Sequence, residues 1–95
     1  MTPVEKVAED LKKEAKRLCP PAFVKVSADP AHDREATVYI YAPRKFADML
    51  QDRLKTLRTQ LLKTTPNLNV RIMMDDMENM SPQLKEQYAK EQQGA

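Results

Sequence analysis

The sequence predicts a two-layer α+β domain, a three-stranded sheet with two helices on one face, in the order α-β-β-α-β plus a short C-terminal helix. Residues 36–42 alternate strictly between apolar and polar side chains, which is the period of a half-buried strand. A helical pattern follows Pro43, and residues 69–74 alternate again. Each long helix has a single apolar stripe, so the two helices can cover only one side of the sheet.

The first helix has clear start and stop signals. Thr2 can cap it, Pro3 suits the first helical position, and Glu5 completes a capping box. Pro20 and Pro21 end it. Between these signals, apolar residues recur at helical spacing: Val4, Val7, Ala8, Leu11, Ala15 and Leu18.

The remaining elements follow from the same patterns. Residues 22–28 alternate and predict a strand, and the polar residues 29–33 predict a hairpin loop leading to the strand at 36–42. The second helix is expected from Arg44 or Lys45 to Lys63. Its apolar seam consists of Phe46, Leu50, Leu54, Leu57 and Leu61.

The chain length allows one domain with a small aliphatic core. Its 95 residues are 41% hydrophobic, but Trp is absent and only 5% are aromatic. Burial alone stabilises a domain of this size marginally, so partner binding or dimerisation would help it. We expect this domain to span residues 1–76. Residues 77–95 are expected to form an acidic loop, a short or frayed helix and a disordered end at 92–95.

The net charge of +2 is unevenly distributed. Residues 1–74 carry 14 Lys and Arg against 9 Asp and Glu, whereas residues 75–95 carry 2 against 5. Mild basicity is compatible with nucleic acid without requiring it. The single cysteine, Cys19, cannot form an internal disulfide, and no apolar run approaches the ~20 residues of a membrane span. We therefore expect a cytoplasmic protein without a membrane segment.

No catalytic, cofactor-binding or metal-binding pattern stands out. His32 lies in a polar loop without a partner in the sequence, and Cys19 has no evident base. The acidic residues at 75–78 match no calcium-loop spacing. The only glycine is penultimate, which excludes a glycine-rich phosphate loop. A non-enzymatic binding domain without a cofactor is the expectation.

The sheet side away from the helices is the main candidate surface. Aromatic and basic side chains are mixed there, which suits stacking of unpaired bases with phosphate contacts. The same side chains could anchor a protein partner or a second copy, or simply face solvent. The anchors in the protein interpretation would be Phe23, Tyr39, Tyr41 and Met73.

The second helix carries a polar strip that includes Gln51 and could follow an RNA backbone. A solvated helix face is the alternative. In the RNA interpretation, cations of this strip and of the sheet bind phosphates while two tyrosines stack on bases. The residues assigned to RNA are Lys25, Tyr39, Tyr41, Arg44, Lys55, Arg58 and Arg71.

Short strand segments at 24–27, 36–40 and 68–76 resemble those of type II KH-like domains, and within that group the ribosome-binding factor A family. The resemblance implies the same order of elements and an RNA ligand, with the ribosome as its setting. Two features depart from the pattern. The chain has no Gly-x-x-Gly loop, and its leucine seam from Phe46 to Leu61 runs without a break. No functional residue is carried over from the resemblance.

Overall fold

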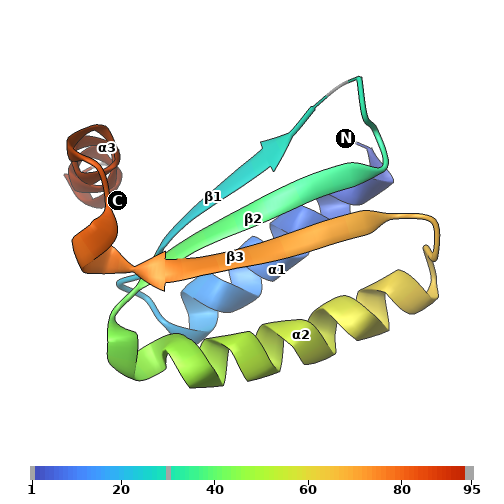
Figure 1. Cartoon of the computed structure of the whole chain (residues 1–95), viewed down its shortest axis with the longest axis horizontal. Coiled ribbons are helices and arrows are strands. Elements are labelled where there is room, and N and C mark those ends of the chain that lie inside the picture. Colours follow the sequence, from blue (N-terminus) through green and yellow to red (C-terminus); the bar gives the residue numbers. More distant parts are fainter. Residues whose placement is uncertain (1, 30, 94–95) are drawn as a thin grey trace.

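A computed structural model describes residues 2–29 and 31–93 (Figure 1). It confirms the predicted α+β class and the predicted order of elements. Two 3-10 turns, η1 and η2, accompany the helices and strands. The elements are α1 (Pro3–Leu18), β1 (Phe23–Ala28), β2 (Glu35–Ala42), η1 (Arg44–Phe46), α2 (Ala47–Lys63), β3 (Asn69–Asp76), η2 (Met77–Asn79) and α3 (Pro82–Gln93).

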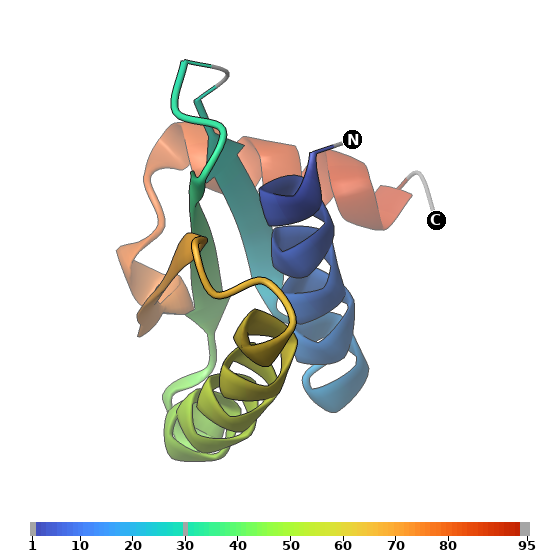
Figure 2. The same cartoon turned by 90° about the vertical axis from the view of Figure 1, so that its right-hand side faces the viewer.

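The sheet has the strand order β1-β2-β3, with β1 antiparallel and β3 parallel to β2. Helices α1 and α2 lie together on one side of it, as Figure 2 shows with the sheet nearly edge-on. The opposite side, which we call the open face, carries no long helix. Helix α3 instead crosses the end of the sheet beside the start of β1 (Figures 1 and 2).

Helix α1 begins and ends where the sequence predicts. The Thr2 hydroxyl oxygen accepts a hydrogen bond from the Glu5 N–H at 3.3 Å, which satisfies one of the free donors of the first turn. The Cys19 N–H donates to the Ala15 carbonyl at 2.9 Å, and two prolines follow. This ending directs the chain into β1.

The core lies between the helices and the inner side of the sheet. Leu11 of α1, Ile40 of β2, and Leu50 and Leu54 of α2 are all completely buried. The valines that the alternation assigned to this side behave as expected, since Val38 is fully buried. Cys19 is buried in the same cluster, and desolvation raises the pKa of its thiol. It is a packing residue, as the sequence indicated.

Three boundaries differ from the sequence prediction by two residues or more, and the starts of β1 and β2 differ by one. Strand β3 continues to Asp76 rather than ending at residue 74, because Asp75 and Asp76 pair with Tyr41 and Ala42 of β2. The turn η1 precedes α2, so Arg44 is outside the helix proper. Helix α3 extends to Gln93, so the disordered end expected at 92–95 is wrong for residues 92 and 93. Residues 94 and 95 lie outside the described part.

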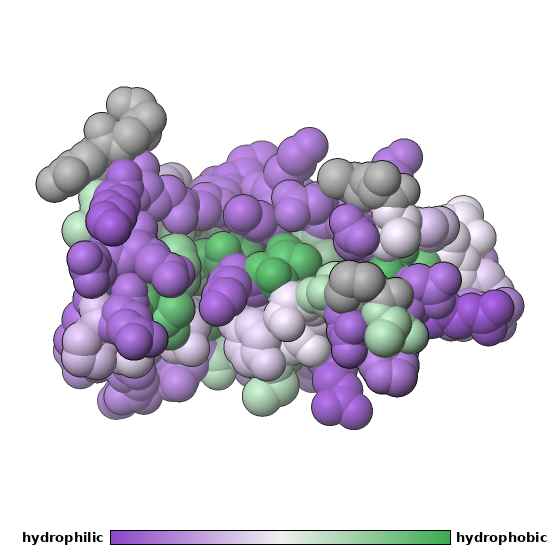
Figure 3. Space-filling view, turned by 90° about the horizontal axis from the view of Figure 1, so that it is seen from above, coloured by the Kyte–Doolittle hydropathy of each residue, from purple (hydrophilic) through white to green (hydrophobic). Residues whose placement is uncertain are grey.

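The turns that the structure describes are built without left-handed residues. None of the described residues has a positive φ, and the chain as a whole contains one glycine and seven prolines. Most of the surface seen from above, onto the β1 edge, is hydrophilic, with apolar side chains exposed as a short seam (Figure 3). Within residues 2–29 and 31–93, no helix has both the length and the apolar character needed to cross a membrane.

Candidate functional site

Strand pairing arranges the open face as three rows that cross all three strands, with a further pair, Glu35 and Asn69, beside Arg71. One row contains Lys25, Tyr39 and Met73, and Tyr39 stands at its centre because β2 is the middle strand. The neighbouring rows are Ser27–Thr37–Arg71 and Phe23–Tyr41–Asp75. Opposed residues on paired strands lie within contact distance of each other, so each row is a physical neighbourhood.

Tyr39 and Met73 are the large apolar side chains that this face exposes. The exposed fraction is 37% for Tyr39 and 53% for Met73. Lys25 and Arg71 are also exposed on the same side. The centre of the face therefore offers an accessible aromatic ring with a cation on each flanking strand, which is the combination needed to stack a base and hold its phosphate.

The end of the face at Phe23 is closed, unlike the sequence expectation of an exposed Phe23. Phe23 retains only 5% of its exposure, because the Tyr88 ring of α3 lies edge-on to it at 6.1 Å between centroids. The ring of Tyr41 also lies near Phe23, with 6.3 Å between the ring centroids, and Tyr41 is half-buried. The sequence did not predict this contact, because α3 has too few apolar residues to show a face that packs on the sheet. Of the three sheet aromatics, Tyr39 is the most accessible.

The same end of the open face carries negative charge. The Asn79 side-chain amide donates to the Asp75 carboxylate at 2.8 Å, and the Asp76 N–H donates at 2.7 Å. These two hydrogen bonds lower the pKa of Asp75, the Asn79 bond contributing most. Asp75 is therefore a carboxylate at neutral pH. An anionic ligand is directed away from this end, toward Arg71.

Three of the cations assigned to RNA do not lie on the open face. Arg44 pairs with Asp76, with 3.3 Å between Nε and Oδ2. Arg58 donates from Nη1 to the Val70 carbonyl at 3.2 Å, which places its guanidinium at the outer edge of β3. Lys55 is exposed on α2. The structure thus divides the seven predicted residues into two groups. The sheet group is Lys25, Tyr39, Tyr41 and Arg71, and the helix group is Arg44, Lys55 and Arg58.

A hollow between the second half of α2 and the start of β3 contains Arg58, whereas Arg44 lies before the other end of α2, beside Asp76. The hollow measures about 460 Å³ and is lined in part by Arg58, Lys63 and Asn69. A second hollow of about 320 Å³ continues from it along α2 to Lys55, and the two share Thr59 and Lys63. We call the two together the α2–β3 hollow. No acidic side chain lines either part.

The sequence prediction did not include Lys63 and Asn69, although the charge pattern around them is informative. Residues 53–74 contain no Asp or Glu, whereas their cations are Arg53, Lys55, Arg58, Lys63 and Arg71. Since α2 returns directly into β3, this acid-free stretch folds back on itself. A helix–loop–strand unit with five cations and no acid has a positive local potential, which attracts anions.

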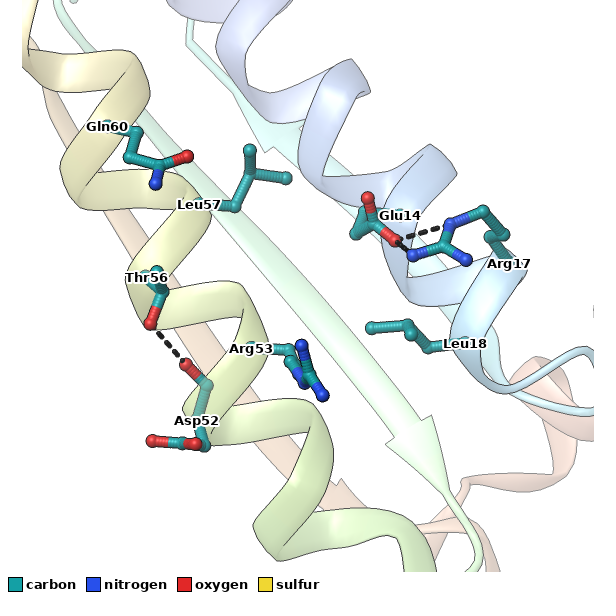
Figure 4. A pocket seen from close by; sticks show the side chains of 8 residues that line it. All are labelled: Glu14, Arg17, Leu18, Asp52, Arg53, Thr56, Leu57 and Gln60. Carbon is teal, nitrogen blue, oxygen red and sulfur yellow. Dashed lines mark hydrogen bonds and ion pairs between the residues drawn. The ribbon is translucent and has the colours of Figure 1, made fainter.

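The hollow between α1 and α2 has a different character (Figure 4). Leu18 and Leu57 contribute its apolar lining. Arg17 pairs with Glu14, and Arg53 lies near Asp52 along the same walls (Figure 4). Charges of both signs are interspersed there, so this hollow has no preference for an anionic ligand.

Groups suited to metal binding or acid–base chemistry do not assemble in the part of the chain that is described. No three His, Cys, Asp or Glu side chains of residues 2–29 and 31–93 are placed to hold a metal ion. His32 is exposed, with Nε2 4.0 Å from an Asp29 carboxylate oxygen. The structure therefore assigns no further functional residue to the hairpin loop.

Comparison with known proteins adds no relative: no family model, no curated protein and no solved structure matches the chain. The KH-like resemblance of the strands therefore stays a prediction. The unbroken second helix that set the chain apart from the ribosome-binding factor A pattern is observed, since α2 is continuous from Ala47 to Lys63.

Proposed function

We propose that the protein is a small, non-catalytic RNA-binding domain that takes single-stranded RNA on its open face. Tyr39 stacks on a base, Lys25 and Arg71 contact the adjoining phosphates, and the strand continues over the β3 edge to the α2–β3 hollow. The resemblance of the strands favours ribosomal RNA and a cytoplasmic setting. The proposal assigns no catalytic residue and no cofactor.

The observation that carries this proposal is the position of the exposed Tyr39 ring. It lies opposite Lys25 on one neighbouring strand and Met73 on the other, with Arg71 in the next row. An aromatic ring binds any base through its π-face, and cations beside it hold the backbone. The exposure of Tyr39, 37%, leaves part of the ring available for such stacking.

The charge distribution supports a direction for the RNA. Asp75, Asp76 and Glu78 lie at the end where β3 meets η2. At the other end of β3, Arg71 on the open face and Arg58 at the outer edge flank Val70. Phosphates are repelled from the first end. At the second end the exposed Glu35 lies opposite Asn69, so the attraction comes from Arg71 and Arg58 and the backbone should cross β3 near residues 70–71.

The experiment is a binding titration with a fluorescently labelled single-stranded oligouridylate. Tyr39→Ala should weaken binding by about 5- to 150-fold, the range for loss of one stacked base, whereas Tyr39→Phe should bind like the wild type. Lys55→Ala should weaken binding, and Lys13→Ala on the exposed side of α1 is the matched control. Absence of binding at micromolar protein, or equal affinities for Tyr39→Ala and the wild type, would contradict the proposal.

A second candidate, a protein-interaction module on the same face, rests on Met73. Its side chain is 53% exposed beside Tyr39, and a protein partner would bury both anchors. Phe23 and Tyr41 would contribute little direct contact, since Tyr88 covers Phe23 and Tyr41 is half-buried. Met73→Ala should leave oligouridylate affinity unchanged in the RNA interpretation and remove partner binding in this one.

A further inference from the structure

The outer edge of β3 has backbone groups available for pairing. The Asn69 N–H donates to Arg34 O on the β2 side, while the Val70 carbonyl accepts from Arg58 on the outer side. Successive residues of a strand direct their N–H and C=O groups to opposite edges. Ile72 and Met74 therefore also face outward. Within residues 2–29 and 31–93, no strand pairs with this edge.

This edge lacks three of the features that commonly block pairing, although it carries charged side chains and has Arg58 on the Val70 carbonyl. Edge strands are commonly kept apart by a proline, a bulge or a very short length. Strand β3 spans eight residues without proline, and its register with β2 is continuous from Asn69 to Asp76. Such a strand is a template for addition of another strand.

The side chains of β3 on the open face are self-complementary. Arg71, Met73 and Asp75 follow one another on this face, with opposite charges at equal distances from the methionine. If a second β3 is laid antiparallel with Met73 opposite Met73, each Arg71 falls opposite the other chain's Asp75. Opposite charges in such cross-strand positions attract, and the two exposed methionines cover each other.

We propose that two copies of this chain pair through the outer edges of their β3 strands, antiparallel and with Met73 on the two-fold axis. The N–H and C=O groups of Ile72 in each chain would form two hydrogen bonds with those of the partner's Met74. Arg71 would form an ion pair with the partner's Asp75. The sheets of both copies would join into one. This inference goes beyond RNA binding, because it concerns the sheet edge and a second protein chain.

The ends of the proposed ladder are already closed in the single chain. Arg58 occupies the Val70 carbonyl, and the Asp75 carboxylate accepts the Asp76 N–H. In the proposed register, Val70 lies opposite the partner's Asp76. The Val70 carbonyl and the Asp76 N–H, which are already bonded to side chains, thus lie at the ends of the paired segment. The backbone groups of Ile72 and Met74 lie at its centre.

Other registers are less favourable. A shift by two residues places Arg71 opposite Met73, or Met73 opposite Asp75, and both ion pairs are lost. A shift by one residue opposes side chains that belong to different faces of the sheet, and it disrupts the hydrogen-bonding pattern. The register centred on Met73 is therefore the one that satisfies charge, hydrogen bonds and burial together.

The first test is sedimentation equilibrium of the full chain without RNA. The wild type should form a dimer with a measurable dissociation constant. Arg71→Asp and Asp75→Arg should each weaken dimerisation at least tenfold, and the double exchange should restore it because the charges are only swapped. Lys25→Asp on β1 is the control. A wild type that is monomeric at millimolar concentration, or an exchange that restores nothing, overturns the proposal.

A second test reads the register directly. Residues at the two-fold axis form a non-hydrogen-bonded pair with about 4.5 Å between Cα atoms, which is within disulfide range. Met73→Cys should therefore cross-link into a covalent dimer on mild oxidation. Arg71→Cys should not, because two residues 71 would be four positions out of register and about 13 Å apart. Cross-linking of Arg71→Cys with none of Met73→Cys would overturn the register.

These tests are independent of the RNA proposal. They are performed without RNA, and they change β3, whereas the stacking test changes Tyr39 of β2. In the proposed dimer Lys25 and Tyr39 remain accessible on both copies, but Arg71 is paired and the second chain covers the β3 edge that the RNA would cross. Oligouridylate binding is therefore measured below the dimer dissociation constant. Absence of binding there contradicts only the proposed function, and a chain that stays monomeric without RNA contradicts only the dimer.

Discussion

The Tyr88 hydroxyl donates a hydrogen bond to the Pro21 carbonyl oxygen at 2.8 Å, joining α3 to the turn between α1 and β1. The same ring lies edge-on to Phe23, and Glu91 one turn later forms an ion pair with Lys16 of α1. A helix with few apolar residues is thereby held against the folded domain by a small number of defined contacts.

Removing this hydroxyl should loosen α3 without unfolding the domain. Tyr88→Phe keeps the ring against Phe23 but loses one hydrogen bond, with an expected cost of about 0.5–1.5 kcal/mol in the docking of α3. Amide hydrogen exchange should quicken in α3 and stay unchanged in β2. Tyr39→Phe, which removes the hydroxyl of an exposed tyrosine, is the control. Uniformly faster exchange throughout the chain would contradict this assignment.

Leu54 should be among the most sensitive positions for stability. It is completely buried at the contact of α2 with the rest of the core. Leu54→Ala should lower the free energy of unfolding by about 2–5 kcal/mol through lost burial and the cavity left behind. Leu57→Ala, one turn along on the same helix and only half-buried, should cost less. Urea denaturation followed by circular dichroism measures both, and equal losses would contradict the predicted ranking.

The Asp75–Asn79 hydrogen bond should make stability depend on acid pH. Because the pKa of Asp75 is lowered in the folded state, its contribution is present above the ordinary Asp pKa of about 3.9. It is lost as the pH falls through the lowered folded value. Asn79→Ala should raise the pKa of Asp75, as measured by carboxyl NMR titration. Asn67→Ala, an exposed loop amide, should leave that titration unchanged.

The α2–β3 hollow should determine part of the salt dependence of RNA binding. Each phosphate contact to a single strand contributes about 0.7 to the slope of log affinity against log salt. Replacing Lys55 and Lys63 together by Gln should therefore reduce the slope by about 1.4 if both contact phosphates. Lys12→Gln with Lys13→Gln on α1 is the matched pair of charge removals. An equal fall in slope for both pairs would indicate a diffuse charge effect instead.

The fold could be predicted from the sequence because its signals were local and mutually consistent. Alternation around Val38 and Ile40, and helical spacing around Leu50 and Leu54, each identify one buried side. The strand end at Asp76 could not be predicted in the same way. Asp75 and Asp76 are poor strand formers by themselves, and their extended conformation depends on pairing with Tyr41 and Ala42.

The candidate surface could be predicted only in outline. Alternation placed Tyr39, Lys25 and Arg71 on one face, and the register agrees with that placement. It carried no information on α3, so the burial of Phe23 under Tyr88 was unexpected. Helical spacing likewise placed Arg58 on a polar strip but did not indicate its bond to the Val70 carbonyl. Contacts between elements distant in the sequence are invisible to periodicity.

The glycine-free turns have a consequence for the unfolded chain. One glycine and seven prolines leave that chain with fewer accessible backbone conformations than an average sequence of this length. Less conformational entropy is then lost on folding, which partly offsets the shortage of buried aromatic area in a small core. Since the described turns use only negative φ, they are also open to further rigidification by proline at exposed positions without hydrogen-bonded N–H groups.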